Sequence, residues 1–181
     1  MLDGRSVDTS MGFTPLDGLV MGTRCGHLDP GALLWLVQHT DEDLLEVLEH
    51  ESGLQGLAGT GDMREVLRRR ADGDGPAELA FEVYQHALRG QVAAMVGALG
   101  GIDALVLTGG VGERLRPVVD ELCSSLGWLG VHVADGQPVA DGVRELSAAG
   151  SAARTFVVHA REDLQMLHEA EPLLVDRPHP A

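Results

Sequence analysis

The stretch DALVLTGGVGE, residues 103–113, joins a short apolar run to a cluster of glycines. An apolar run bounded by glycines is typical of a parallel strand buried on both faces, so we expect a strand over 103–108. The GGVGE turn should lead into a helix from about Glu113 to Leu126. Glycine amides at the carboxyl edge of such a strand can bind a phosphate or a nucleotide. Glycines also serve purely structural turns, and the spacing and the missing lysine exclude a Walker loop.

After this strand and helix, the sequence predicts further strands and helices in alternation. Further strands are expected over 128–135 (WLGVHVAD) and 155–160 (TFVVHA), and a helix over about 162–170. Such alternation predicts an α/β domain whose central sheet, largely parallel or mixed, is flanked by helices. The proline-rich end, 172–181, lacks periodicity and is expected to form a disordered tail, which leaves 1–171 as the folded domain.

The chain before this unit is mostly helical in pattern. Capping residues and apolar spacing predict helices over 30–39, from Thr40 to Gly53, from Asp62 to the cluster Arg68–Arg70, and from Pro76 to about Leu99. The first two helices are expected to pack as a hairpin, and the glycine-rich stretch 54–61 to form a loop. The arginine cluster has a simple interpretation as a solvated helix end that complements the negative end of the helix dipole.

Composition narrows the classes of function. Acidic residues outnumber basic ones 28 to 13, and the net charge of -15 repels nucleic acids and anionic membranes. Cys25 and Cys123 are too few for a disulfide framework or a zinc site. No stretch resembles a leader or a membrane span. We therefore expect a cytoplasmic protein with no nucleic-acid or membrane partner.

The most specific part of the sequence is SVDTSMGFTPLDGLVMGTRCGHLDP, residues 6–30. It resembles the signature of the acetate kinases, in which a strand delivers D-T-S-M-G-F-T-P-L and M-G-T-R follows. The stretches GLAGTGDMREV, DALVLTGGVGE and AREDL then follow in the order of that family. The resemblance extends from about Gly4 to Ala170. Residues 4–26 are rich in glycine, serine, threonine and aspartate, which predicts a short strand followed by an ordered loop. The resemblance implies an actin-like ATPase (ribonuclease H-like) domain, related to sugar kinases and heat-shock ATPases.

The resemblance further implies the C-terminal, nucleotide-binding half of an acetate kinase, with most of the acid-binding half absent. Such enzymes exchange a phosphoryl group between ATP and acetate, giving ADP and acetyl phosphate reversibly, with Mg²⁺ or Mn²⁺. The implied partners are ATP or ADP, acetate or a similar short carboxylate, a second copy in a homodimer, and a separate N-terminal half. Two alternatives stay open, namely a propionate or butyrate kinase fragment and a non-catalytic nucleotide-binding or dimerisation remnant.

Site residues follow from the matched motifs. Arg24, in M-G-T-R, is expected to stabilise the transition state, because a planar guanidinium can hold a transferring phosphoryl group. Glu162 is expected on the magnesium side, although without the motif it would be only a favourable first-turn acid. The resemblance assigns nucleotide binding to Asp62, Met63, Arg64, Gly110, Val111, Gly112, Glu113 and Arg114. Asp62 has a compatible structural role as a helix N-cap.

Some positions depart from the family pattern. Ala160 and Arg161 replace a polar pair before Glu162, which puts the strength of metal binding in doubt. Arg114 stands where the family usually has asparagine, and can instead meet a nucleotide phosphate. Cys25 and His27 stand where serine and aspartate are common, and Cys25 is interpreted as a small neutral replacement.

Overall fold

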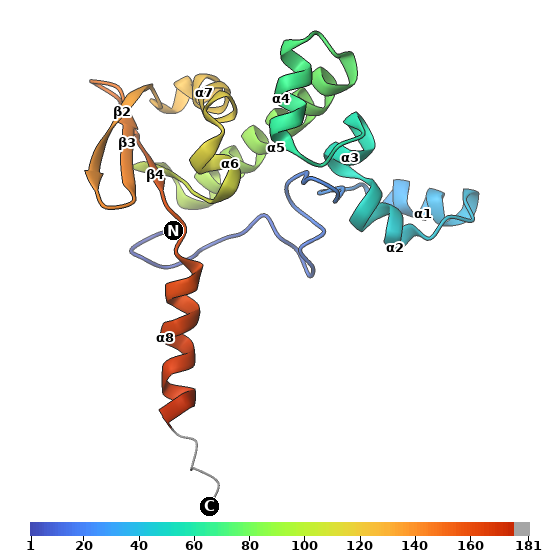
Figure 1. Cartoon of the computed structure of the whole chain (residues 1–181), viewed down its shortest axis with the longest axis horizontal. Coiled ribbons are helices and arrows are strands. Elements are labelled where there is room, and N and C mark those ends of the chain that lie inside the picture. Colours follow the sequence, from blue (N-terminus) through green and yellow to red (C-terminus); the bar gives the residue numbers. More distant parts are fainter. Residues whose placement is uncertain (176–181) are drawn as a thin grey trace, which may run out of the picture.

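The structure is a computed structural model that describes residues 1–175, and residues 176–181 lie outside the described part. Helices dominate the first hundred residues, and strands with covering helices follow (Figure 1). The elements are α1 (Pro30–His39), α2 (Leu44–Glu46), a π-helical turn (Val47–Glu51), α3 (Gly53–Ala58), α4 (Met63–Ala71), α5 (Gly75–Leu99), β1 (Ala104–Leu107), α6 (Gly109–Arg114), α7 (Arg116–Ser125), a 3₁₀ turn (Gly127–Leu129), β2 (Val133–Ala140), β3 (Val143–Ser147), β4 (Arg154–Val158) and α8 (Glu162–Val175).

The four strands form one mixed sheet in the order β1-β4-β3-β2. β1 and β4 are parallel, with Leu107 opposite Val157, whereas β3 runs antiparallel to both of its neighbours. The strand expected over 128–135 begins only at Val133, because residues 127–129 form the 3₁₀ turn. The expected burial of β1 on both faces was wrong. Burial alternates along β1, and Val106 is 55% exposed because nothing among the described residues covers that face.

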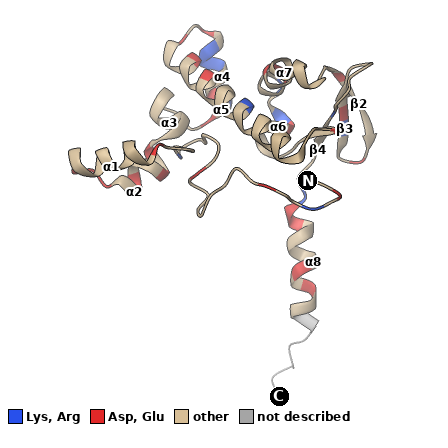
Figure 2. Cartoon of the chain, turned by 180° about the vertical axis from the view of Figure 1, so that it is seen from behind, with Lys and Arg blue, Asp and Glu red and all other residues tan. Residues whose placement is uncertain are grey.

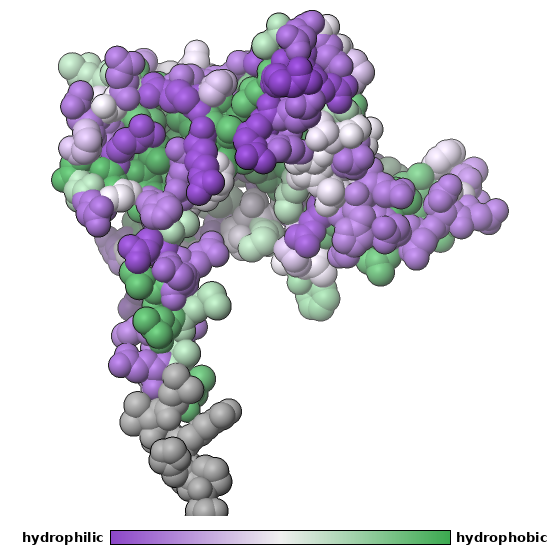
Figure 3. All heavy atoms as spheres, in the orientation of Figure 1, coloured by the Kyte–Doolittle hydropathy of each residue, from purple (hydrophilic) through white to green (hydrophobic). Residues whose placement is uncertain are grey.

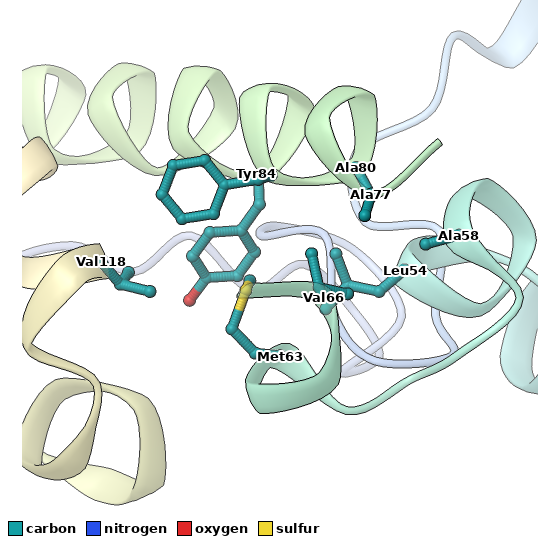
Figure 4. Packing of buried hydrophobic residues seen from close by; sticks show 9 residues of the cluster. Leu54, Ala58, Met63, Val66, Ala77, Ala80, Tyr84 and Val118 are labelled. Atoms are coloured by element: carbon teal, nitrogen blue, oxygen red, sulfur yellow. The ribbon is translucent and has the colours of Figure 1, made fainter. Parts of the chain in front are cut away.

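Two apolar clusters hold the elements together. The first includes Phe81 and other residues of α5 together with residues of α3, α4 and the start of α7. Figure 4 shows this cluster, with Tyr84 between α4 and α7. The second lies between α7 and the sheet, with Leu122 and Leu146 fully buried. Leu88 of α5 packs against both clusters, so this long helix links the helical part to the sheet.

Aspartates cap the starts of four helices, and two of them, Asp29 and Asp62, do so where the sequence predicts a helix to begin. The carboxylates of Asp29, Asp43, Asp62 and Asp74 accept backbone N–H groups at the starts of α1, α2, α4 and α5. The second helix therefore begins after Asp43 and not at Thr40, which ends α1. The expected packing of these two helices as a hairpin is not seen, because α1 buries none of its residues.

The glycine-rich stretch expected to be a loop contains the short helix α3. Leu54 and Ala58 of this helix are 2% and 4% exposed and join the first cluster. Packing of these two side chains against α4 and α5 outweighs the low helix propensity of the glycines. Gly59 ends the helix in the left-handed conformation that glycine adopts readily.

Figure 2 shows arginines at the end of α4. Their side chains form a set of ion pairs, so the cluster is not simply a solvated helix end. Arg68 bonds Glu65 and Asp72, and Arg69 bonds Asp74 and the carbonyl of Ala58. A third arginine, Arg70, pairs with Glu78 and lies 4.0 Å from the centre of the Phe81 ring. The three arginines are therefore bonded to neighbouring residues of the fold and are not simply exposed to solvent.

The two ends of the described chain differ from expectation. Residues 6–29 form no strand, and the only pairing near them is an isolated bridge between Leu2 and Arg5. No neighbouring strand for this segment exists among the described residues. α8 extends away from the body and continues to Val175, so residues 172–175, expected in the tail, are helical (Figures 1 and 3). The remainder of the expected tail, 176–181, lies outside the described residues. Within residues 1–175, no helix combines the length and apolar character needed to cross a membrane.

Candidate functional site

A pocket of about 720 Å³ lies between the helical part and the turn that follows β1. Six of the predicted nucleotide-binding residues line this main pocket, although they come from two stretches nearly 50 positions apart: Asp62, Met63, Arg64, Gly110, Val111 and Arg114. The other walls are largely apolar, formed by Leu19, Val20, Met21, Gly22, Leu54, Gly61, Tyr84 and Leu115. A mostly apolar hollow with a few polar groups at its rim is typical of a small-molecule site.

Asp62 and Arg64 form one polar edge of the main pocket. The carboxylate of Asp62 caps α4 by accepting the Arg64 N–H at 2.9 Å. It also accepts two guanidinium N–H groups of Arg64, at 3.0 Å from Nε and 2.7 Å from Nη2. These bonds lower the pKa of Asp62, so the pair is ionised at neutral pH. The N-cap role expected for Asp62 is thus confirmed, and the same carboxylate orients Arg64.

The glycine-rich turn forms the opposite edge. The helix expected from about Glu113 starts earlier, at Gly109, so GGVGE is itself the short helix α6, and Leu115 separates it from α7. Gly109 has a φ of +73°, which favours glycine at this abrupt turn. No atom lies within 4 Å of a Cβ placed at Gly110, so space next to its backbone is open to a ligand.

Gly112 and Glu113 do not line the main pocket. A Cβ at Gly112 would lie 3.3 Å from the Cβ of Leu107, which indicates that this glycine allows α6 to pack closely on β1. Glu113 instead accepts bonds from the backbone N–H groups of Gly109 and Ala160, each at 2.9 Å, and lies 2.6 Å from His159 Nδ1. The N–H of Ala160, His159 and the N–H of Gly109 hold the pKa of Glu113 at about 2.

The loop that carries Arg24 is fixed by its backbone. The Thr23 carbonyl accepts the Ser52 N–H at 3.0 Å, the Thr23 hydroxyl donates to the Glu49 carbonyl at 2.8 Å, and the Cys25 N–H donates to the Leu48 carbonyl at 3.1 Å. Two of these acceptors lie in the π-helical turn, a feature often found at functional sites. The loop thus holds its place without any help from the Arg24 side chain.

Arg24 itself is half-buried, and its guanidinium has no hydrogen-bond or ion-pair partner among residues 1–175. It does not line the main pocket, but Met21 and Gly22 of the same loop do. Burial raises the pKa of the adjacent Cys25 thiol, which agrees with a neutral, unreactive side chain. The loop therefore borders the main pocket through Met21 and Gly22, and the Arg24 guanidinium on the same loop has no partner within residues 1–175.

Glu162 lies in a neighbouring hollow, which we call the side pocket, of about 350 Å³. The side pocket shares Gly110 and Arg114 with the main pocket and also includes Glu113, His159 and Asp163. Within residues 1–175, no three His, Cys, Asp or Glu side chains converge to hold a metal ion. Glu162 is exposed at the start of α8 and unpaired within the described chain, whereas Asp163 lies 3.4 Å from Arg161.

These residues fit one kind of metal site. Magnesium is commonly bound by one or two carboxylates together with substrate phosphates and water, and not by a cage made only of protein atoms. One available carboxylate beside a candidate nucleotide pocket agrees with that pattern. Of the exposed carboxylates that line the side pocket, Glu162 has no partner within residues 1–175, whereas Asp163 lies 3.4 Å from Arg161.

Sequence reasoning missed Tyr84 as a pocket residue. Tyr84 lies on α5, is 8% exposed, and contributes to both the first apolar cluster and the wall of the main pocket (Figure 4). It is the only tyrosine in the chain, and its place in a long helix gives no sign of a pocket. Tyr84 lines the pocket because residues 61–64 and 110–115 lie close to it in the folded chain, and the sequence does not indicate this proximity.

Comparison with known proteins gives a consistent result. A family model described as the Acetokinase family matches residues 1–168. The chain is similar to the acetate kinase of Nostoc punctiforme, with 44% identity over 89% of this chain and 41% of that protein. It is also similar to the acetate kinase of Syntrophobacter fumaroxidans, with 43% identity over 92% of this chain and 42% of that protein.

Solved structures show the same likeness. The propionate kinase of Francisella tularensis subsp. tularensis SCHU S4 has a TM-score of 0.83 and 36% identity, covering 93% of this chain and 44% of that chain. The acetate kinase of Entamoeba histolytica has a TM-score of 0.86 and 30% identity, covering 96% of this chain and 46% of that chain.

These matches confirm the expected actin-like α/β fold with its mixed sheet. The chain spans about 42% of the length of the curated relatives that it matches. Family model, relatives and structures all point to one group, and the chain belongs to the acetokinase family.

Proposed function

We propose that this chain supplies the nucleotide-binding part of an acetate kinase-type phosphotransferase. The reaction is reversible phosphoryl transfer from ATP to the carboxylate of acetate, which gives ADP and acetyl phosphate. A short-chain relative of acetate is a second acceptor to test, because a propionate kinase is among the similar structures. The activity requires a complementary part for the acid, since the chain spans only about 42% of its relatives.

The observation that carries this proposal is the composition of the main pocket. Apolar residues, among them Met63 and Tyr84, offer a surface for a purine ring, and the Asp62–Arg64 pair offers hydrogen-bonding groups at its rim. The open backbone at Gly110 and the exposed guanidinium of Arg114 suit the approach of phosphates from the other side. One nucleotide spans these two edges in our proposal.

Arg24 and Glu162 have the roles that the phosphoryl transfer requires. Negative charge spreads over the equatorial oxygens of the transferring group, so a positioned guanidinium stabilises the transition state. Arg24 takes this role because its guanidinium is unpaired within the described chain and its loop borders the main pocket. Bound Mg²⁺, or Mn²⁺, neutralises phosphate charge, and Glu162 provides the carboxylate for it.

We further place the protein in the cytoplasm and propose that it pairs with a second copy of itself. Exposed apolar side chains support a partner, because Leu34, Trp35 and Val37 of α1 are each about 60% exposed. Apolar atoms are exposed along α8 (Figure 3). Met166 and Leu167, which are 70% and 61% exposed, are available to the complementary part of the enzyme.

Calorimetric titration of the purified chain with ADP and Mg²⁺ tests nucleotide binding. The wild-type chain should bind, and Asp62→Asn should weaken binding about tenfold, because it removes the charge that orients Arg64 and contacts the nucleotide. An asparagine retains an oxygen that can cap α4, so the helix start is preserved.

The matched control is Asp29→Asn, which makes the same change at the N-cap of α1, away from the main pocket. This variant should bind ADP as the wild type does. Absence of binding by the folded wild-type chain, or an equal loss in both variants, would contradict the proposed site.

A further inference from the structure

Glu113 connects the ends of two neighbouring strands. β1 ends at Leu107 and β4 at Val158, and the strands run parallel, so their carboxyl ends lie at one edge of the sheet. Gly109 and Ala160 each lie two residues beyond these strand ends. Their N–H groups both donate to Glu113 Oε1 at 2.9 Å, while Oε2 lies 2.6 Å from His159 Nδ1. One carboxylate therefore joins two turns that are about 50 positions apart in the sequence.

The carboxylate is not available as a nucleotide ligand. Its side chain is 12% exposed, and both oxygens are already engaged by these donors. Because the carboxylate is ionised, His159 must present Nδ1 as a donor. A direct contact with a nucleotide would require these bonds to break, and would bring a second negative charge towards the phosphates.

The two joined turns carry different parts of the site. Gly109 precedes Gly110, which lines both pockets, and Ala160 lies two residues before Glu162 in the side pocket. We propose that Glu113 is a positioning residue, which fixes the Glu162 carboxylate relative to the nucleotide turn and so couples metal binding to nucleotide binding. This inference rests on the proposed function, and it assigns Glu113 a role different from the direct nucleotide contact expected from the sequence.

The test uses Glu113→Gln in the whole chain, with ADP affinity measured by calorimetry in the presence and absence of Mg²⁺. Glutamine preserves the shape but removes the negative charge that strengthens all three bonds, and its amide nitrogen can only donate, so His159 would have to present Nδ1 as an acceptor. The strengthening of ADP binding by Mg²⁺ should fall about tenfold, as is usual when the support of a metal ligand is removed. ADP affinity without metal should change much less.

A second substitution separates positioning from general damage to the fold. In a Glu162→Gln background the carboxylate that Glu113 positions is already gone, so adding Glu113→Gln should leave the remaining effect of Mg²⁺ unchanged. The matched control is Glu145→Gln, because Glu145 is also an ionised carboxylate held by hydrogen bonds, here from Arg154, but it lines neither pocket. This control should bind Mg²⁺ and ADP like the wild type.

The outcomes distinguish this inference from the proposed function. Failure of the wild-type chain to bind ADP would contradict the proposed function and this inference with it. Normal ADP binding with an unchanged Mg²⁺ effect in Glu113→Gln, or additive losses in the double variant, would contradict the inference alone. If thermal unfolding shows that Glu113→Gln does not fold, His159→Ala removes one donor from an exposed position, and an unchanged Mg²⁺ effect there would equally overturn it.

Discussion

Replacing Arg24 with alanine is expected to lower the rate of acetyl phosphate formation about a thousandfold, because a guanidinium that stabilises a transferring phosphoryl group contributes on this scale. The assay uses a chimera that joins this chain to the N-terminal part of a full-length acetate kinase. ADP affinity should change little, since the contact is made mainly in the transition state. The backbone bonds of the loop do not involve the Arg24 side chain, so the loop should keep its place.

Two variants make this result specific. Arg24→Lys keeps the charge but loses the planar pair of donors, and should recover only part of the rate. Arg5→Ala removes an exposed arginine from the same N-terminal segment and should leave the rate unchanged. Equal losses of turnover and of ADP affinity in Arg24→Ala would show that this arginine binds the nucleotide in the ground state and would contradict its assigned role.

Replacing Phe81 with alanine is expected to have the largest effect on stability. Phe81 is completely buried at the centre of the first apolar cluster, and its ring lies under the guanidinium of Arg70 at 4.0 Å. Truncation of a buried phenylalanine costs about 3–5 kcal/mol, which for a chain of this size lowers the melting temperature by on the order of 10 °C. Thermal unfolding followed by circular dichroism measures this change.

The chain provides a matched control for this substitution. Phe13 is fully exposed, with a relative accessibility of 105%, so Phe13→Ala should leave the melting temperature nearly unchanged. A small shift for Phe81→Ala, similar to that for Phe13→Ala, would mean that the cluster between α3, α4 and α5 is not the core of the helical part. The wall of the main pocket would then lack its rigid support.

Local signals in the sequence predicted those parts of the fold that depend on local chemistry. Asp29 and Asp62 precede helices and accept their first free N–H groups, which is a property of a few neighbouring residues. The same local reasoning gave wrong predictions where contacts between distant residues determine the secondary structure. Glycines predicted a loop over 54–61, but burial of Leu54 and Ala58 stabilises α3. β3 was not predicted, because VRELS contains two charged residues and buries only Leu146.

The candidate site was predictable as a set of motifs but not as an arrangement. The matched motifs named Asp62, Arg64, Gly110 and Arg114, and the fold brings them to one pocket. Nothing in the sequence indicated that Glu113 accepts the N–H of Ala160, since that bond spans 47 positions and depends on the pairing of β1 with β4. Contacts between distant turns follow from the register of the sheet, which short motifs do not determine.

A crystal structure of the chain with Mg²⁺ and ADP would show whether the main pocket binds the nucleotide. We expect adenosine in the main pocket, between Tyr84 and Val111. The phosphates should lie beside Gly110 and Arg114, and the metal on the side of Glu162. Glu113 should keep its bonds to Gly109 and Ala160. ADP bound elsewhere on the chain, or a main pocket that stays empty at saturating ADP, would show that the main pocket is not the nucleotide site.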